Sequence, residues 1–218
     1  MQIGNQLSHR TSTVRYGILL LGRHLGKSAV EAIGHKQGIV AEALLTTLVV
    51  DDATLDNALK ELGNGKYKNL PDSVVRQRLI NMVHYVPDMH CPVHVGFPKK
   101  EFAHYRYNIY RKGKKISYHG FWDGSPGYMR KNWTIATYAA EVDKVSPKLA
   151  KKWVKGSLDD WARDIIRQAH RCYQITPADC DVAEFKEKDI ALVQELSDEM
   201  ALKGAYRLAH ILNTIFAE

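Results

Sequence analysis

The stretch that decides the fold is His84-Tyr85-Val86-Pro87-Asp88-Met89-His90-Cys91-Pro92-Val93-His94, which places three histidines and an aspartate close together. A second group follows as His119-Gly120-Phe121-Trp122-Asp123. Side chains four positions apart lie on one face of a helix, so His84 and Asp88 can reach the same point. His119 and Asp123 repeat that spacing. Imidazole nitrogen and carboxylate oxygen are common zinc ligands, and the two segments together therefore predict a zinc site.

The segment before the first group is predicted to be the helix that presents it. Asp72 and Ser73 can cap its start, and apolar residues recur at helical spacing as far as Val83. Pro87 removes one backbone donor, which predicts a kink or a helix end near the candidate ligands.

Residues 105–118 change to a period of two, which predicts a short β-hairpin with its turn at residues 111–115. This hairpin is expected to deliver His119 back beside the first segment. Its lysine-rich turn, although near the proposed site, reads as a solvated tip rather than a phosphate track. Lys148, Lys151, Lys152 and Lys155 likewise indicate an exposed helix face.

Helical periodicity predicts further helices over residues 13–25, 28–50, 54–62, 131–144, 147–154, 157–173 and 186–217. Residues 46–50 alone could form a strand. Asp52 is a possible cap and Gly63 a stop for the helix at 54–62, and Gly204 could break the last helix in two. The sequence shows no repeat and no linker. The predicted fold class is therefore all-α, a single mostly helical domain over residues 1–218 with a short β-hairpin.

Composition sets broad limits on function. The 218 residues are 45% hydrophobic and 25% charged, as in ordinary soluble globular proteins. A net charge of +7 and a pI near 9.2 suit an anionic partner such as nucleic acid. Cys91, Cys172 and Cys180 lack CxxC spacing, which argues against a zinc-thiolate site and allows at most one internal disulfide. No apolar run is long enough to span a membrane, and residues 14–22 make no clear signal peptide.

The candidate ligands indicate a type of chemistry. Clustered zinc ions lower the pKa of bound water and clamp the oxygens of a phosphodiester, and Asp88 is the candidate catalytic carboxylate that bridges metals. No Ser/His/Asp or Cys/His nucleophile pair and no glycine-rich phosphate loop is evident. Attack by metal-activated water on a phosphate ester is therefore the economical interpretation.

Several residues are expected to have ordinary roles. Cys91 is expected to be a small buried residue rather than a ligand. Trp122 and Trp133 are expected in the core. The four isolated histidines are expected to be plain surface or core residues: His9, His24, His170 and His210.

Residues 83–94 resemble the HxxGDxxxPxH signature of the zinc-dependent single-strand nucleases, a family of fungal secreted enzymes, plant bifunctional nucleases and bacterial relatives. Residues 118–123 resemble that family's LHxxWD motif. Trp161-Ala162 with residues 170–173 is similar to its WA…C helix, and residues 204–213 to its closing GxRLAxxLN. The motifs follow in the family's order, and the resemblance covers residues 72–217, with residues 1–50 divergent.

The resemblance implies a phospholipase C-like helical fold that holds up to three zinc ions in a cleft. His84 and Asp88 would ligate one zinc, with Asp88 also touching a neighbouring one. His94, His119 and Asp123 would hold a second, complete site, whereas His90 is not at a ligand position. It also implies cleavage of single-stranded RNA or DNA to 5′-nucleotides, 3′-nucleotidase activity, and secretion or export to the periplasm.

The chain departs from the family pattern in its first third. The family's mature chain begins with a zinc-binding Trp, but the first tryptophan here is Trp122, and the signature Gly is Pro87. Two more ligands, an Asp and a His, have only Asp51, Asp52 and His35 as candidates. One complete zinc site is therefore expected. The alternatives are a weakly active or inactive zinc protein that binds nucleic acid, and a phospholipase C-like phosphoesterase.

Overall fold

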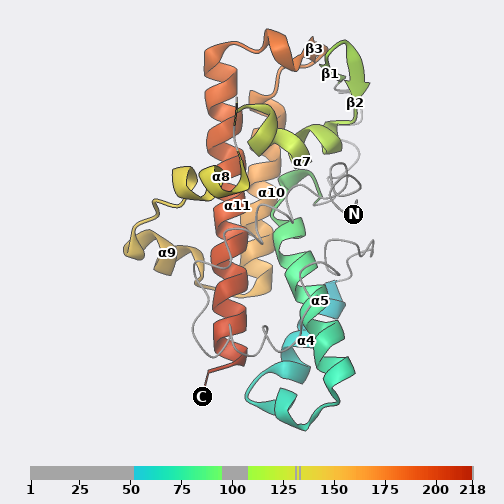
Figure 1. Cartoon of the computed structure of the whole chain (residues 1–218), viewed down its shortest axis with the longest axis vertical. Coiled ribbons are helices and arrows are strands. Elements are labelled where there is room, and N and C mark those ends of the chain that lie inside the picture. The colour runs from blue at the N-terminus through green and yellow to red at the C-terminus, as the bar shows by residue number, and fades with distance from the viewer. Residues whose placement is uncertain (1–51, 95–107, 131, 133, 218) are drawn as a thin grey trace. The chain divides into compact units, whose positions relative to one another are not determined.

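A computed structural model describes residues 52–94, 108–130, 132 and 134–217 of the chain (Figure 1). Helices make up most of these residues, and the predicted all-α class is confirmed. The predicted helices at 13–25 and 28–50, and hairpin residues 105–107, lie outside the described residues.

The described residues fall into two compact units. Residues 52–88, 145–154 and 203–217 belong to the first, and residues 89–94, 108–144 and 155–202, apart from positions 131 and 133, belong to the second. The prediction of a single domain over residues 1–218 stays a prediction. None of the described helices is both long and apolar enough to cross a membrane.

The first unit begins with α4 (Asp52–Leu62), and Gly63 ends this helix as predicted. The Gly63 amide donates to the carbonyl oxygen of Leu59 at 2.9 Å, and a Cβ on Gly63 would lie only 2.8 Å from that oxygen. The segment that follows contains a short 3₁₀ turn, η1 (Lys66–Asn69). The ring of Tyr67 in η1 packs edge-on against Phe216, with centroids 4.9 Å apart.

α5 (Asp72–Met89) carries the first histidine and aspartate of the signature stretch. Its apolar side buries Val75, Leu79, Met82 and other residues, which explains why this helix forms along its whole length. The helix ends two residues after Pro87, so the predicted end near the candidate ligands is confirmed. The 3₁₀ turn η2 (Pro92–His94) follows and belongs to the second unit.

The second unit contains α7 (Tyr118–Tyr128), α8 (Ile135–Val142), α10 (Leu158–Ile175) and the first part of α11 (Glu187–Ile215). Its core includes Phe121, Trp122, Ile165, Cys172 and Leu196, all at most 2% exposed. The burial of Trp122 was expected, and Trp133 lies outside the described residues.

Polar caps explain where three helices begin, two in the second unit and one in the first. The Ser157 hydroxyl accepts from the amide of Asp160, whose carboxylate accepts from the Ser157 amide, a capping box that starts α10. Thr134 caps α8 in the same way, so this helix starts later than the predicted residue 131. Ser146 caps α9 (Pro147–Trp153) of the first unit. This helix carries three of the lysines expected to be exposed, Lys148, Lys151 and Lys152, whereas Lys155 lies beyond its end.

α11 runs through Gly204 without a break, so the predicted interruption there is wrong. A glycine inside a helix costs about 1 kcal/mol relative to alanine. The neighbouring side chains of Ala205, Leu208 and Leu212 are all fully buried, and their packing offsets that cost.

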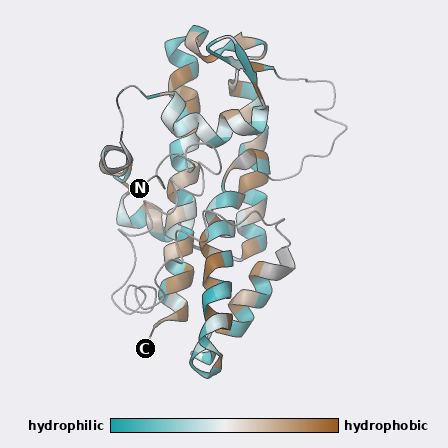
Figure 2. Cartoon of the chain, turned by 45° about the vertical axis from the view of Figure 1, so that its right-hand side comes forward, coloured by the Kyte–Doolittle hydropathy of each residue, from teal (hydrophilic) through white to brown (hydrophobic). Residues whose placement is uncertain are grey.

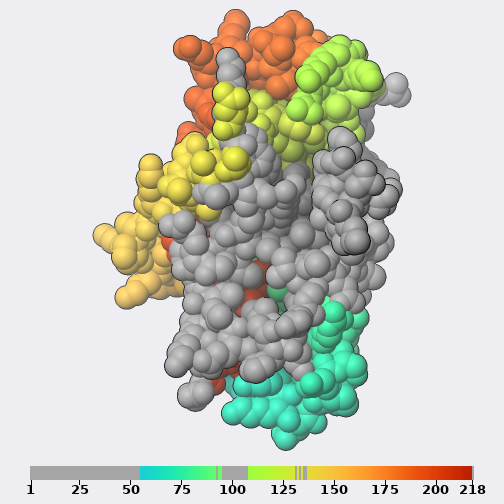
Figure 3. Space-filling model, in the orientation of Figure 1, coloured from blue at the N-terminus to red at the C-terminus, as the bar shows by residue number. Residues whose placement is uncertain are grey.

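The predicted hairpin exists, but it is part of a three-stranded sheet. β1 (Ile109–Arg111) and β2 (Lys114–Ile116) are antiparallel, and Lys112 and Gly113 both have positive φ in the tight turn. β3 (Cys180–Asp181) pairs in parallel with β1, giving the order β2-β1-β3 (Figure 1). The hairpin is largely hydrophilic and lies at the surface, as expected for a solvated tip (Figures 2 and 3).

Candidate metal centre

α7 is the element that positions two of the predicted ligands. The hydroxyl of Ser117 accepts a hydrogen bond from the Gly120 amide at 2.9 Å and so caps the helix start directly after β2. Phe121 and Trp122 are buried in the core of the second unit, and this burial fixes the rotation of the helix. The spacing of four then places His119 and Asp123 together on one face.

The carboxylate of Asp123 contacts two imidazole rings. Its Oδ2 lies 2.9 Å from Nε2 of His119, one helical turn earlier, and its Oδ1 lies 2.9 Å from Nε2 of His94. The two imidazole centroids are 4.2 Å apart. His94 reaches this place because η2 contacts both α7 and α10. The structure thus brings three of the predicted ligands together from two distant parts of the sequence.

The exposure of these groups falls in a clear order. The side chain of His119 is 59% exposed, that of Asp123 18% and that of His94 13%. Burial by itself would raise the pKa of Asp123, but hydrogen bonds from His119 and His94 outweigh it and hold the pKa well below its usual range. Asp123 is therefore a largely buried anion at neutral pH, next to the more exposed ring of His119.

Cys91 adds a fourth candidate ligand that the sequence interpretation had set aside. It is buried, as predicted, at 2% exposure, but ligand atoms of Cys91, His94 and Asp123 all lie within 4.8 Å of one another. With zinc–ligand bonds of about 2.0–2.3 Å, the ligand atoms of a tetrahedral site lie about 3.3–3.7 Å apart. The donor types suit zinc, and the 4.8 Å bound is wider than the spacing of a metal-loaded tetrahedral site. The sequence contains one signal for this ligand: Cys91 lies three residues before His94, and the turn into η2 brings the two residues to the same side of the chain.

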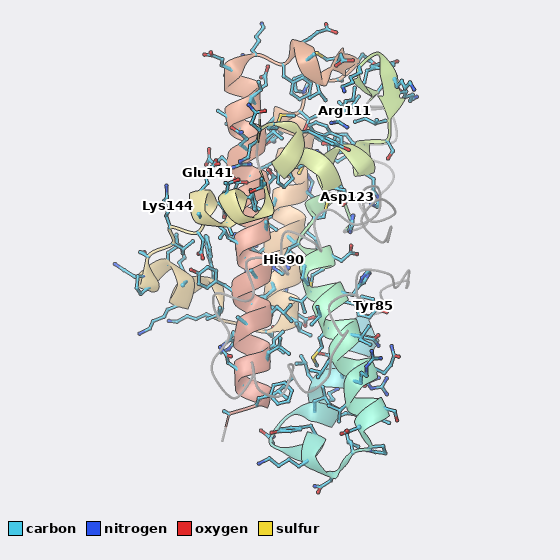
Figure 4. The ribbon with its side chains drawn as sticks, viewed as in Figure 1. Tyr85, His90, Arg111, Asp123, Glu141 and Lys144 are labelled. Carbon is cyan, nitrogen blue, oxygen red and sulfur yellow. The ribbon has the colours of Figure 1, made fainter. Side chains whose placement is uncertain are left out.

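His84 and Asp88 lie on α5 in the first unit. His84 is buried, with 3% exposure, and Asp88 is partly exposed near the helix end. The neighbouring Tyr85 has its pKa raised by burial and then by the charge of Asp88, so the two side chains interact (Tyr85, Figure 4). His90, which the family pattern does not make a ligand, is fully buried in the second unit.

The candidates for the remaining family ligands lie outside the described part of the chain. His35 and Asp51 lie outside the described residues, as does the side chain of Asp52, whose backbone begins α4. His9 and His24 also lie outside them, and His170 and His210 are partly exposed and exposed, respectively.

A polar network holds the far end of α7 in place. The guanidinium of Arg130 donates to the carbonyl oxygen of Pro126 at 2.9 Å, to Glu141 at 3.1 Å and to the carboxylate of Asp198 on α11 (Glu141, Figure 4). The hydroxyl of Tyr138 donates to the other oxygen of Asp198 at 3.1 Å. This network ties α7 to α8 and α11, and thereby supports the helix that carries Asp123.

The fold is mostly helical, and the imidazole and carboxylate groups of His94, His119 and Asp123 meet at one point. These features define a helical protein with a candidate metal centre. The chain matches the S1/P1 nuclease family over residues 45–217, and it belongs to that family. The motifs recognised in the sequence start at residue 72, and the family match begins before that position. Membership places the protein among hydrolases that cleave phosphodiester bonds in nucleic acid. No curated protein matches the chain.

Proposed function

We propose that this protein is a zinc-dependent phosphodiesterase that cleaves single-stranded RNA or DNA to 5′-nucleotides and also acts as a 3′-nucleotidase. The observation that carries the proposal is the Asp123 carboxylate, whose two oxygens each lie 2.9 Å from a histidine nitrogen. Such a set of one anionic and two neutral donors suits Zn²⁺, and the family match over residues 45–217 supports the reaction.

In this proposal the ligands divide into two groups. His94, His119 and Asp123 hold one zinc ion, and His84 with Asp88 hold another, Asp88 being the catalytic carboxylate. Zinc bound there would lower the pKa of a water molecule and neutralise charge on the phosphate oxygens. The protein positions the donors: η2 and α7 set the first group, and one face of α5 sets the second.

The substrate side of the proposal rests on exposure and charge. His119 is the most exposed of the three clustered ligands, so a phosphate can approach the centre past its ring. The net charge of +7 favours association with a polyanion. By analogy with the family, we also propose that the protein acts after secretion or in the periplasm.

The test combines metal counting with an activity assay. We expect elemental analysis of protein isolated without chelators to find zinc, and added zinc to support hydrolysis of single-stranded nucleic acid. Asp88→Asn keeps the side-chain shape but removes the charge, and is expected to lower turnover at least about 100-fold, as removal of one transition-state-stabilising group does. Asp56→Asn, on the exposed side of α4, is the matched control. Absence of zinc, or full turnover in Asp88→Asn, would overturn the proposal.

A second candidate function is zinc-dependent binding of nucleic acid without hydrolysis. The specific observation for it is Pro87, which stands in α5 immediately before Asp88 where the family has glycine and removes a backbone donor there. This alternative predicts that the protein retains zinc and retards single-stranded DNA in a gel, while neither DNA nor a nitrophenyl phosphodiester is hydrolysed. Hydrolysis of either substrate would exclude it.

A further inference from the structure

We propose that Cys91 is a further protein ligand of the metal held by His94, His119 and Asp123. The inference rests on the metal site of the proposed function and adds to it a thiolate ligand. Its basis is positional: Cys91 shares one point in the second unit with His94 and Asp123, each offering a ligand atom within 4.8 Å of the others.

The backbone explains why the cysteine and the histidine meet. The amide of His94 donates to the carbonyl oxygen of Cys91 at 2.9 Å, which closes a turn and brings the two residues to the same side of the chain. Asp123 then approaches from α7, and its contact with His119 adds the remaining nitrogen donor. The site therefore takes two ligands from one tight turn and two from one helical turn.

Neither of the other two cysteines is grouped with these ligands. Cys172 is fully buried in the core of the second unit, and Cys180 is in β3 with its sulfur near the carbonyl oxygen of Asp181. The described residues contain no disulfide, so all three sulfurs are thiols. On binding the metal, Cys91 gives up its proton to solvent and coordinates as the thiolate.

A thiolate ligand changes the metal preference of the centre. A soft sulfur donor favours zinc or cobalt over magnesium or calcium.

Cobalt substitution of the full chain tests this ligand directly. Co²⁺ in a protein site gives visible ligand-field bands whatever its ligands, but a thiolate-to-cobalt charge-transfer band in the near ultraviolet requires a coordinated cysteine. We expect both features in the wild-type protein. Cys91→Ser should remove the near-ultraviolet band and keep visible bands, while Cys180→Ser should keep both. His94→Ala, which removes a nitrogen ligand of the same centre, should remove the near-ultraviolet band as well.

Chelator competition gives a second measurement. Loss of an outer-shell partner already weakens metal binding about 10–100-fold. Loss of a direct ligand in Cys91→Ser is therefore expected to weaken zinc binding at least about 100-fold, with no such change in Cys180→Ser.

The outcomes separate this inference from the proposed function. Visible bands without a near-ultraviolet band in the wild-type protein would overturn the role of Cys91 and leave the zinc site standing. A near-ultraviolet band that survives in Cys91→Ser would overturn it too. Failure to bind cobalt or zinc at all would overturn both proposals.

Discussion

Removal of zinc should lower the thermal stability of the protein, and the length of the loop that the metal closes sets the size of this effect. A metal held by His94 and Asp123 cross-links η2 to α7 and closes a loop of about 30 residues. The chain-entropy relation for cross-links gives about 3.5 kcal/mol for a loop of that length. Mass action gives a similar value, about 4 kcal/mol, when free zinc is about 1,000-fold above the dissociation constant.

For a chain of this size, 1 kcal/mol corresponds to about 2–4 °C in Tm. The zinc-loaded protein should therefore melt about 7–14 °C above the chelator-treated protein. The assay is differential scanning fluorimetry at a fixed protein concentration, with excess zinc and with excess chelator. The informative variant is Asp123→Asn, which keeps the shape of the side chain but removes the anionic oxygen pair that faces the two histidines.

Asp123→Asn is expected to lose most of the zinc-dependent shift, whereas Asp56→Asn, on the exposed side of α4, should keep it. The comparison between variants removes any contribution from zinc bound at His84 and Asp88. An equal shift in the wild-type protein and Asp123→Asn would refute the reasoning, because the stabilising metal would then be bound elsewhere.

Two further predictions concern the elements that support the centre. Arg130→Ala leaves the largely buried Asp198 without its cation and should destabilise the fold by about 3 kcal/mol or more in urea unfolding. Arg130→Lys should recover part of this loss, and a change below about 1 kcal/mol in Arg130→Ala would contradict a stabilising network. Ser157→Ala removes the hydroxyl of the α10 capping box and should cost about 1 kcal/mol in the same measurement. An unchanged unfolding midpoint would show that other groups satisfy the helix terminus.

The basic character of the chain is a property of the whole sequence, whereas the candidate centre depends on a few local contacts. The side chain of His119 is 59% exposed and that of Asp123 only 18%, so among these two groups His119 is the one that a ligand can reach from solvent. Gly124, next to Asp123, leaves room for the ring of Tyr128. A Cβ at this position would lie 2.2 Å from that ring. The guanidinium of Arg111 covers that ring from β1 at 4.2 Å.

Local patterns in the sequence predicted the parts of the protein that depend on neighbouring residues. The stop of α4 at Gly63, the end of α5 after Pro87 and the shared face of His119 and Asp123 all follow from spacing and backbone chemistry within one or two helical turns. The hairpin turn at Lys112 and Gly113 is of the same kind. These features were accessible without coordinates because the interacting groups are close along the chain.

Contacts between distant segments were decided only by the tertiary structure. The parallel pairing of β3 with β1 joins residues about 70 positions apart, and a two-residue strand has no pattern of its own. Gly204 stays helical because packing of its neighbours outweighs its weak propensity. The approach of Cys91 and His94 to Asp123 likewise needs η2 to pack against α7, an arrangement set by burial of apolar side chains across the core rather than by any local sequence rule.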